Sequence, residues 1–218
     1  MNKLFSPMAV ALSVTLSSTL APLANAGGDA AKGQALTAVC AACHGQDGNS
    51  PMAIYPKLAG LGEKYLLKQL QEIKSGVRPV VEMTGLLTNL SDQDLADIAA
   101  YFNSKTTQLS GSKEMKVLVN SGEEVDALAL GTKLYRAGNK EAGIPACTGC
   151  HSPRGQGNAP AGYPRLSGQH SDYVIKQLKA FRAGERTNDG EAKVMRSIAE
   201  RMTDAEITAI ANFVAGLH

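Results

Sequence analysis

Two short segments of one pattern, CAACH at residues 40–44 and CTGCH at residues 147–151, contain all 4 cysteines of the 218-residue chain. In each segment the cysteines stand three positions apart, so on a helical turn both thiols face the same side. A histidine directly after the second cysteine completes the pattern of covalent c-type haem attachment, in which the thiols bind the porphyrin vinyl groups and the imidazole ligates the iron. The sequence therefore predicts two covalently bound haem c groups. The predicted tethers are Cys40, Cys43, Cys147 and Cys150, and the predicted iron ligands are His44 and His151.

Disulfides, a zinc site and a redox-active pair are the other common uses of paired cysteines. Disulfides are the default in an oxidising compartment, but they give no reason for a histidine directly after each pair. A zinc site built from two Cys-x-x-Cys pairs usually has about 15–20 residues between them, whereas roughly 100 residues separate these two pairs. A thioredoxin-like pair needs a βαβ context, which the sequence around both segments lacks. Haem attachment is therefore the favoured interpretation.

The first 26 residues have the features of a secretory signal. Lys3 gives a positive start, residues 8–23 are mostly apolar, and Ala24, Asn25 and Ala26 form a small-residue cleavage site. A membrane anchor is the alternative, but the apolar run is shorter than the ~20 residues that a span needs and is interrupted by Ser and Thr. We expect cleavage after Ala26 and a mature protein outside the cytoplasm.

The composition excludes some classes of function. The chain is 44% hydrophobic and 19% charged with a net charge of +2, as in an ordinary globular protein. It has no dense Lys/Arg stripe interleaved with aromatic residues, so nucleic acid is not an expected partner. Only 5% of residues are aromatic and none is Trp. Two haems would supply the apolar surface that such small cores otherwise lack.

An internal repeat divides the chain into two halves. Residues 55–60 (YPKLAG) match residues 163–168 (YPRLSG), and residues 65–70 (YLLKQL) match residues 173–178 (YVIKQL). Because each half also carries one Cys-x-x-Cys-His segment, we expect two tandem domains that each enclose one haem.

The predicted secondary structure is all-α. Apolar positions at i, i+3, i+4 and i+7 in residues 95–102 and 207–214 indicate a final helix in each half. Ser91 and Thr203 are the expected N-caps, and Thr203 with Glu206 forms a capping box. No period-two strand pattern of useful length is present. The expected division is a signal peptide at residues 1–26, haem domains at residues 27–104 and 127–218, and a connector at residues 105–126.

The approach to the cysteines differs between the halves. Seven positions lead from Gly33 to Cys40, but sixteen lead from Gly131 to Cys147. The additional residues include Gly138, and we expect them to break the helix that leads to the second haem.

Each iron needs a sixth ligand, and methionines are the candidates. Met83 and Met195 occupy equivalent places in an ungapped match before the final helices, in loops that can reach the opposite face of the haem. Met52 follows His44 too closely to reach that face. Met202 is a rival for the second iron, but it directly precedes an N-cap and is better explained as a hydrophobic staple. Core filling is the alternative role for Met83 and Met195.

The signal sequence, the two Cys-x-x-Cys-His segments and the two Tyr-Pro-Lys/Arg-Leu segments together resemble those of the dihaem cytochromes c4. The same resemblance extends over the stretches at residues 65–76, 82–85, 90–102 and 187–190. The resemblance implies two class I cytochrome c domains with His/Met iron that exchange electrons across their interface. It also implies a periplasmic relay between respiratory-chain donors and terminal oxidases. Peripheral association with a membrane stays open.

The predicted ligands favour an electron carrier over an enzyme. Histidine and methionine together leave no vacant iron position for a substrate, and the soft thioether favours Fe(II). The alternative is a dihaem redox enzyme, either peroxidase-like or thiosulfate-oxidising, which needs an exchangeable iron ligand. A purely structural or gas-binding haem protein is a third hypothesis.

Several other residues have weaker predicted roles. His170 aligns with Gly62, so we expect a surface or interface histidine and not a third ligand. Pro56 and Pro164 each open a Pro-x-Leu-x-Gly run that resembles a turn of class I cytochromes c. Their carbonyls are therefore the expected acceptors for the proximal histidines, whose second ring nitrogen normally donates a hydrogen bond. The alternative is that both prolines only stiffen a loop. Pairing with haem propionates or solvation at the surface are the alternatives for three arginines, Arg78, Arg182 and Arg186.

Overall fold

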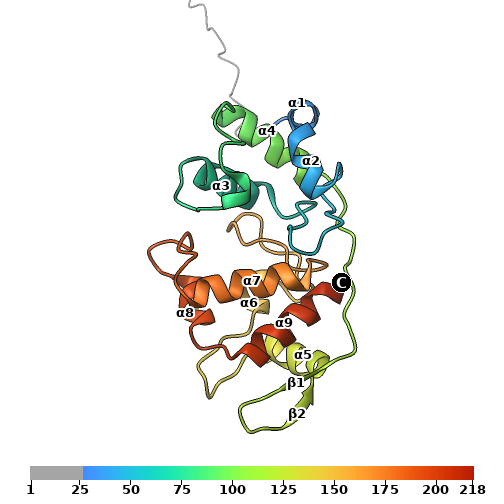
Figure 1. The fold of residues 1–218 in the computed structure, drawn as a ribbon, viewed down its shortest axis with the longest axis vertical. Helices are drawn as coiled ribbons and strands as arrows, with labels where there is room; N and C mark the ends of the chain where they lie inside the picture. Colours follow the sequence, from blue (N-terminus) through green and yellow to red (C-terminus); the bar gives the residue numbers. More distant parts are fainter. Residues whose placement is uncertain (1–26) are drawn as a thin grey trace, which may run out of the picture.

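The computed structural model describes residues 27–218, and the predicted signal peptide lies outside them. The described chain forms two helical units stacked along the long axis of the molecule, joined by a strand-bearing connector (Figure 1). The described residues are mostly helical, so the predicted all-α fold is confirmed. Among the described residues, none of the helices has the length and apolar character to cross a membrane. The first unit contains α1 Ala30–Leu36, α2 Ala38–His44, α3 Glu63–Lys74, η1 Val81–Met83 and α4 Asp92–Asn103. The second contains α5 Ala127–Ala137, α6 Thr148–His151, α7 Ser171–Arg182, α8 Val194–Ala199 and α9 Asp204–Gly216.

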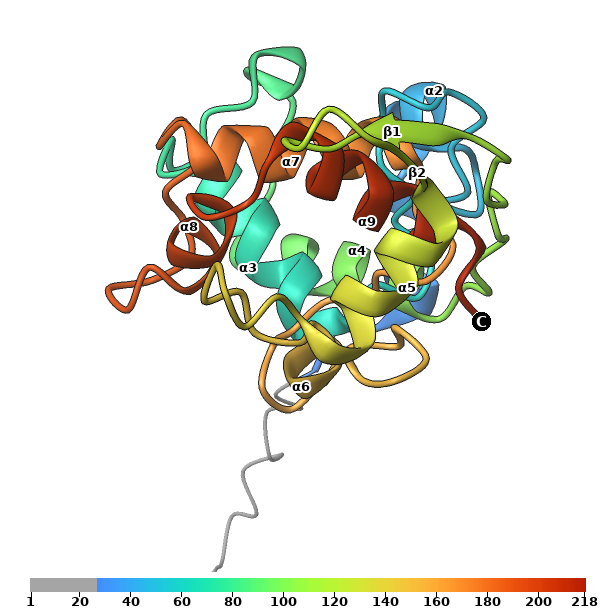
Figure 2. The ribbon, with the colours of Figure 1, turned by 90° about the horizontal axis from the view of Figure 1, so that it is seen from below.

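The first and last helices of each unit cross at a glycine. A Cβ atom on Gly33 of α1 would overlap the carbonyl oxygen of Asp97 in α4, and one on Gly131 of α5 would overlap that of Ala209 in α9. Glycine at these two equivalent positions therefore lets the helix backbones touch. This crossing brings the helix before each cysteine segment against the final helix of its unit, α1 against α4 (Figure 1) and α5 against α9 (Figure 2).

The final helices begin where the sequence predicts. Ser91 accepts a hydrogen bond from Asp94 N at 3.1 Å and Thr203 accepts one from Glu206 N at 3.2 Å. Both helices have complete capping boxes. The box at Ser91 uses Asp94 where the usual pattern has Glu or Gln.

The connector contains the only two named β-strands of the described chain. Strands β1 Lys116–Leu118 and β2 Glu124–Asp126 pair antiparallel. Each has three residues, too short to give a period-two signal, so the sequence pattern did not predict them. Val117 packs on Ala127 and Ala205, which attaches this hairpin to the second unit.

The approach to the second cysteine segment breaks as expected. Helix α5 ends at Gly138, whose φ of 72° suits a residue without a Cβ atom. A short turn closed by the Asn139–Ile144 bridge follows. Helix α6 is then only 4 residues long, against 7 for α2.

Candidate haem sites

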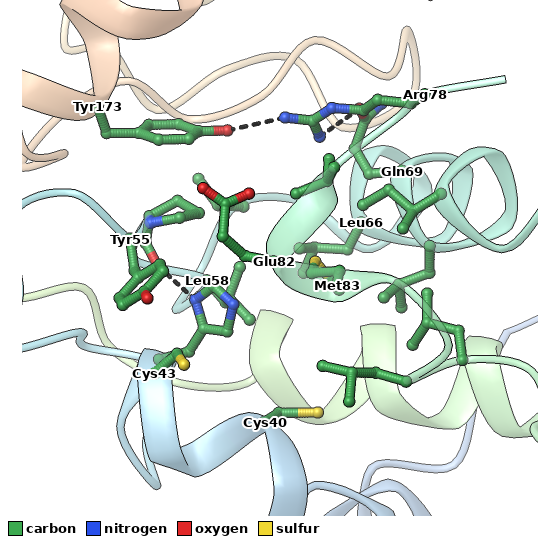
Figure 3. Close-up of a pocket in the computed structure, with 18 of the residues that line it drawn as sticks. Cys40, Cys43, Tyr55, Leu58, Leu66, Gln69, Arg78, Glu82, Met83 and Tyr173 are labelled. Carbon is green, nitrogen blue, oxygen red and sulfur yellow. Dashed lines mark hydrogen bonds between the residues drawn. The ribbon is translucent and has the colours of Figure 1, made fainter. Parts of the chain in front are cut away.

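The first site is a cavity of about 380 Å³ between α2, α3 and the segment before α4. Cys40, Cys43, His44 and Met83 all line it, and most of its remaining wall is aliphatic. Figure 3 shows both cysteines along the α2 side, with Met83 reaching in from the η1 segment. The cavity thus brings together all four residues predicted for the first haem.

The proximal histidines are held in the same way in both halves. His44 Nδ1 lies 2.9 Å from the Pro56 oxygen, and His151 Nδ1 lies 2.9 Å from the Pro164 oxygen. Because a carbonyl oxygen only accepts, Nδ1 carries the proton and Nε2 keeps its lone pair for a metal. Burial lowers the pKa of both histidines, against a smaller opposing effect of the proline carbonyls. The expected proline contacts are present, and the lowered pKa favours the neutral imidazole at both histidines.

The cysteines are unpaired thiols beside these histidines. All four are free and partly buried. Burial raises the pKa of the Cys147 thiol to about 11, and burial also raises the pKa of the Cys40 thiol. The two members of each segment lie on one helical turn, as thioether attachment needs and as a disulfide pairing between segments does not.

The methionines lie in single-turn helices where the sequence predicted loops. Met83 ends η1, and Met195 is the second residue of α8. Helix α8 has 6 residues, with Lys193 before it in the left-handed region at φ 48°, and such short turns lack the periodic signal of longer helices. Met195 packs against the core of the second unit together with Cys147.

The rival methionines occupy different environments. Met52 is 39% exposed. Met202 is 6% exposed and belongs to the same core cluster as Ile207. This placement agrees with the staple role expected for Met202.

Two arginines join the two units through a pseudo-symmetric set of hydrogen bonds. Arg78 donates to Gln69 of its own unit at 2.8 Å, and Arg186 donates to Gln177 of its own unit at 2.7 Å. Across the interface, Arg78 donates to Tyr173 at 3.2 Å and to Gln177 at 3.1 Å. Arg186 donates to Tyr65 at 3.2 Å and to Gln69 at 3.1 Å. Figure 3 shows the Arg78 contacts with Gln69 and Tyr173.

The surface alternative is therefore wrong for two of the three arginines. Arg186 is 9% exposed, and Arg78 and Arg186 both line the first cavity. Arg182 instead lies at the edge of the second unit, where it forms an ion pair with Asp204 at 2.5 Å and donates to the Met202 carbonyl.

His170 is an interface residue, as expected. Its Nε2 lies 2.8 Å from the carbonyl oxygen of Ser50 in the first unit. Its Nδ1 lies 3.0 Å from the hydroxyl of Ser110 in the connector. His170 thus joins three segments of the chain.

Sequence reasoning missed the glutamines at this interface. Gln69 and Gln177 recur at the same position of the repeated Tyr-x-x-Lys-Gln-Leu segments, and this recurrence was the signal that could have found them. Gln169 is also buried and bonded across the interface. Its counterpart in the first half is Leu61, so the repeat gave no signal there.

The residues of the first cavity fit a covalent haem. Two thiols on one helical turn, a neutral imidazole nitrogen and a thioether face one largely aliphatic space. Two guanidinium groups, that of the buried Arg186 and that of the partly buried Arg78, lie on its wall, and their hydrogen-bond partners are neutral oxygen atoms. Buried cations of this kind suit the carboxylate groups of a haem.

Comparison with known proteins confirms the two cytochrome c domains that the sequence predicted. The Cytochrome c family model matches residues 30–106 and 128–218. The chain is 56% identical over 218 residues to a Pseudomonas aeruginosa protein named cytochrome c4, covering 100% of both chains. It is similar to the crystal structure of reduced recombinant cytochrome c4 from Pseudomonas stutzeri, with a TM-score of 0.81 and 49% identity over 88% of this chain and 100% of that one. A more distant relative, 36% identical over 97% of this chain and 92% of its own, is named a thiosulfate dehydrogenase electron acceptor, from Thiomonas intermedia.

Proposed function

The chain belongs to the cytochrome c4 family, and we propose that it relays electrons in the periplasm through two haems, each ligated by one histidine and one methionine. As a member of that family it is a dihaem c-type cytochrome that carries electrons and is not an enzyme. Bound haem supplies the one-electron Fe(II)/Fe(III) couple for this relay.

The shared cavity of Cys40, Cys43, His44 and Met83 is the observation that carries the ligand assignment. His44 presents a lone pair from Nε2, because its Nδ1 proton is donated to Pro56. Met83 offers a thioether from another segment of the same wall. We assign Cys147, Cys150, His151 and Met195 the equivalent roles in the second half.

Arg78 and Arg186 have a second role in this proposal. Their hydrogen-bond partners are side-chain amide oxygens and phenol oxygens, which leave the two positive charges without a directly bonded carboxylate. We assign them the neutralisation of haem carboxylates near the junction of the units. In that position they would also hold the two redox centres in one orientation.

The proposed domains keep the boundaries expected from the sequence. They are residues 27–104 and residues 127–218, with a connector at residues 105–126 and a cleaved signal at residues 1–26. The hairpin of β1 and β2 in the connector packs on the second domain, so we propose that the connector is fixed to that domain and is not a free linker.

The proposed partners are redox proteins, a respiratory donor complex and a terminal oxidase. The relative named as a thiosulfate dehydrogenase electron acceptor adds a thiosulfate-oxidising enzyme as a second candidate donor. Either donor would use the chain as an electron carrier, which needs no substrate site of its own.

Ligand binding tests the carrier assignment. Two irons that already have histidine and methionine ligands should bind carbon monoxide poorly when reduced and cyanide poorly when oxidised. Visible spectra during titration with each ligand give the measurement. Tight binding at one iron would overturn the proposal in favour of a redox enzyme, because catalysis at iron needs a vacant or exchangeable position.

A further inference from the structure

One peptide group of the first domain lies between the proximal histidine and the second domain. The Pro56 carbonyl of this group accepts the Nδ1 proton of His44 at 2.9 Å. The N–H of the same group, which belongs to Lys57, donates to Gln169 Oε1 at 2.9 Å. A continuous chain of hydrogen bonds therefore runs from Gln169 through a single peptide to His44.

The Gln169 side chain forms two hydrogen bonds with the backbone of Lys57. Besides accepting from Lys57 N, it donates from Nε2 to the Lys57 carbonyl at 2.9 Å. Lys57 and Gln169 are each 4% exposed. The pair is thus shielded from water, where hydrogen bonds are strongest and where an unpaired partner is most costly.

Hydrogen bonds in such a chain polarise one another. An N–H that donates to Gln169 makes the carbonyl of the same peptide a better acceptor. A better acceptor draws more strongly on the Nδ1 proton and makes the imidazole a more basic iron ligand. A more basic ligand stabilises Fe(III) over Fe(II), so the reduction potential falls.

We propose that Gln169, a residue of the second domain, is a positioning residue that strengthens the Pro56–His44 hydrogen bond and lowers the reduction potential of the first haem. This inference rests on the proposed role of His44 as an iron ligand. It makes one domain a determinant of the other domain's redox chemistry.

On the side of the second haem, the corresponding peptide group has a weaker hydrogen bond to the other domain. The N–H of Arg165, which shares a peptide group with the Pro164 carbonyl, donates to the backbone oxygen of Leu61 at 3.3 Å. Leu61 stands at the position equivalent to Gln169, and its side chain has no amide. The bond is longer and comes from one backbone atom, so its effect on His151 is smaller.

Gln169→Met in the full-length holoprotein tests the proposal, because methionine keeps the length of the side chain but makes neither hydrogen bond. Gln169→Asn is the second variant, since its amide is one methylene shorter and does not reach both ends of the Lys57 residue. Lys64→Met is the matched control. It removes another bond between the domains, from Lys64 Nζ to the Pro160 carbonyl at 2.9 Å, that does not touch the His44 loop.

The readouts are the two midpoint potentials, from spectroelectrochemistry, and the His44 Nδ1–H proton resonance of the reduced protein. Met195→His, which should move only the second potential, assigns the potentials to the haems. Both Gln169 variants should raise the first potential, leave the second almost unchanged and move the His44 resonance upfield. Lys64→Met should change none of the three.

An unchanged first potential in both Gln169 variants would overturn the inference, as would equal shifts at both haems or the same shift in Lys64→Met. Failure of the underlying function is separate. It would be seen in the unsubstituted protein, as one iron without methionine or as tight binding of carbon monoxide.

Discussion

The two halves of the molecule repeat the contacts that set ligand chemistry but fill their interiors differently. The His44–Pro56 and His151–Pro164 hydrogen bonds have equal length, and the contacts of Arg78 mirror those of Arg186. The buried clusters are unequal. The first half has a small one around Ile98 and Phe102, whereas the second has a larger one that adds a connecting turn and a longer final helix.

This difference means that the halves depend unequally on their cofactors. Ile144 brings the additional turn of the second half into its core, where Leu134 and Tyr135 of α5 are also buried. In the first half, residues of α3 and α4 line the cavity. A haem there is a larger part of the interior, since a small domain buries too little surface without added apolar material.

Removal of the cysteines that bind haem should have the largest effect and should show most clearly how the two halves differ in their dependence on haem. Replacing Cys147 and Cys150 by Ala should leave one covalent haem per chain and destabilise the second half selectively. Replacing Cys40 and Cys43 should do the same to the first half, with the greater loss of helicity because its own core is smaller. Intact mass, haem staining and circular dichroism on heating measure these outcomes. Two haems remaining in either variant would contradict the tether assignment.

Substitution of the axial methionines comes next in size. Met83→Leu and Met195→Leu should each abolish the methionine–iron charge-transfer band of one haem. Met195→His should keep six ligands and lower the second potential by on the order of 0.1 V, a fraction of the ~0.8 V over which axial ligands set haem potentials.

Met202→Leu is the control for this assignment, because Met202 is buried in the core beside Ile207. It should leave both charge-transfer bands intact. Loss of one band in Met202→Leu but not in Met195→Leu would show that the sixth ligand of the second haem is wrongly assigned.

The interface arginines test the symmetry of the junction. Arg78→Met and Arg186→Met each remove one of the arginine donors to Gln69 and Gln177 and leave one tyrosine hydroxyl, Tyr173 or Tyr65, without its arginine donor. We expect each change to cost about 1–3 kcal/mol in the free energy of unfolding. Arg186→Met should cost more, because Arg186 also donates to Asn188 at 2.9 Å and lies 4.5 Å from the Phe181 ring. Denaturant unfolding of the holoprotein measures both. Equal stability of both variants and the parent would mean that the junction does not depend on these contacts.

Replacement of the prolines should have the smallest effect. Pro56→Ala keeps the carbonyl but adds an N–H and frees φ, so it should loosen the His44 hydrogen bond. We expect a small rise in the reduction potential of the first haem, with that of the second almost unchanged. In Pro164→Ala the second potential should rise and the first should stay almost unchanged. Redox titration of the two variants compares them. A shift of both haems in either variant would show that the proline acts on the whole molecule and not on its own histidine.

Sequence patterns predicted what depends on local spacing. The cysteine segments, the proline acceptors for His44 and His151, and the caps at Ser91 and Thr203 all follow from residues close together in the chain or from the repeat. Two local features were missed, the hairpin of β1 and β2 and the helical turn at Met195, because both are too short to show a period.

Contacts between the halves could not be read in the same way. Arg78 meets Tyr173, and Gln169 meets Lys57, only after the two units pack together. No spacing in the sequence fixes how two folded units approach each other. The burial that distinguishes Arg186 from a solvated arginine is a product of that packing.

Proton NMR of the fully reduced protein tests the central claim, two haems that are each ligated by histidine and methionine, most directly. A methionine bound to diamagnetic haem iron lies over the porphyrin ring, whose ring current moves its methyl signal far upfield. We predict two such three-proton signals, one lost in Met83→Leu and the other in Met195→Leu, with both retained in Met202→Leu. One signal in the unsubstituted protein, or two that persist in Met83→Leu, would contradict the account.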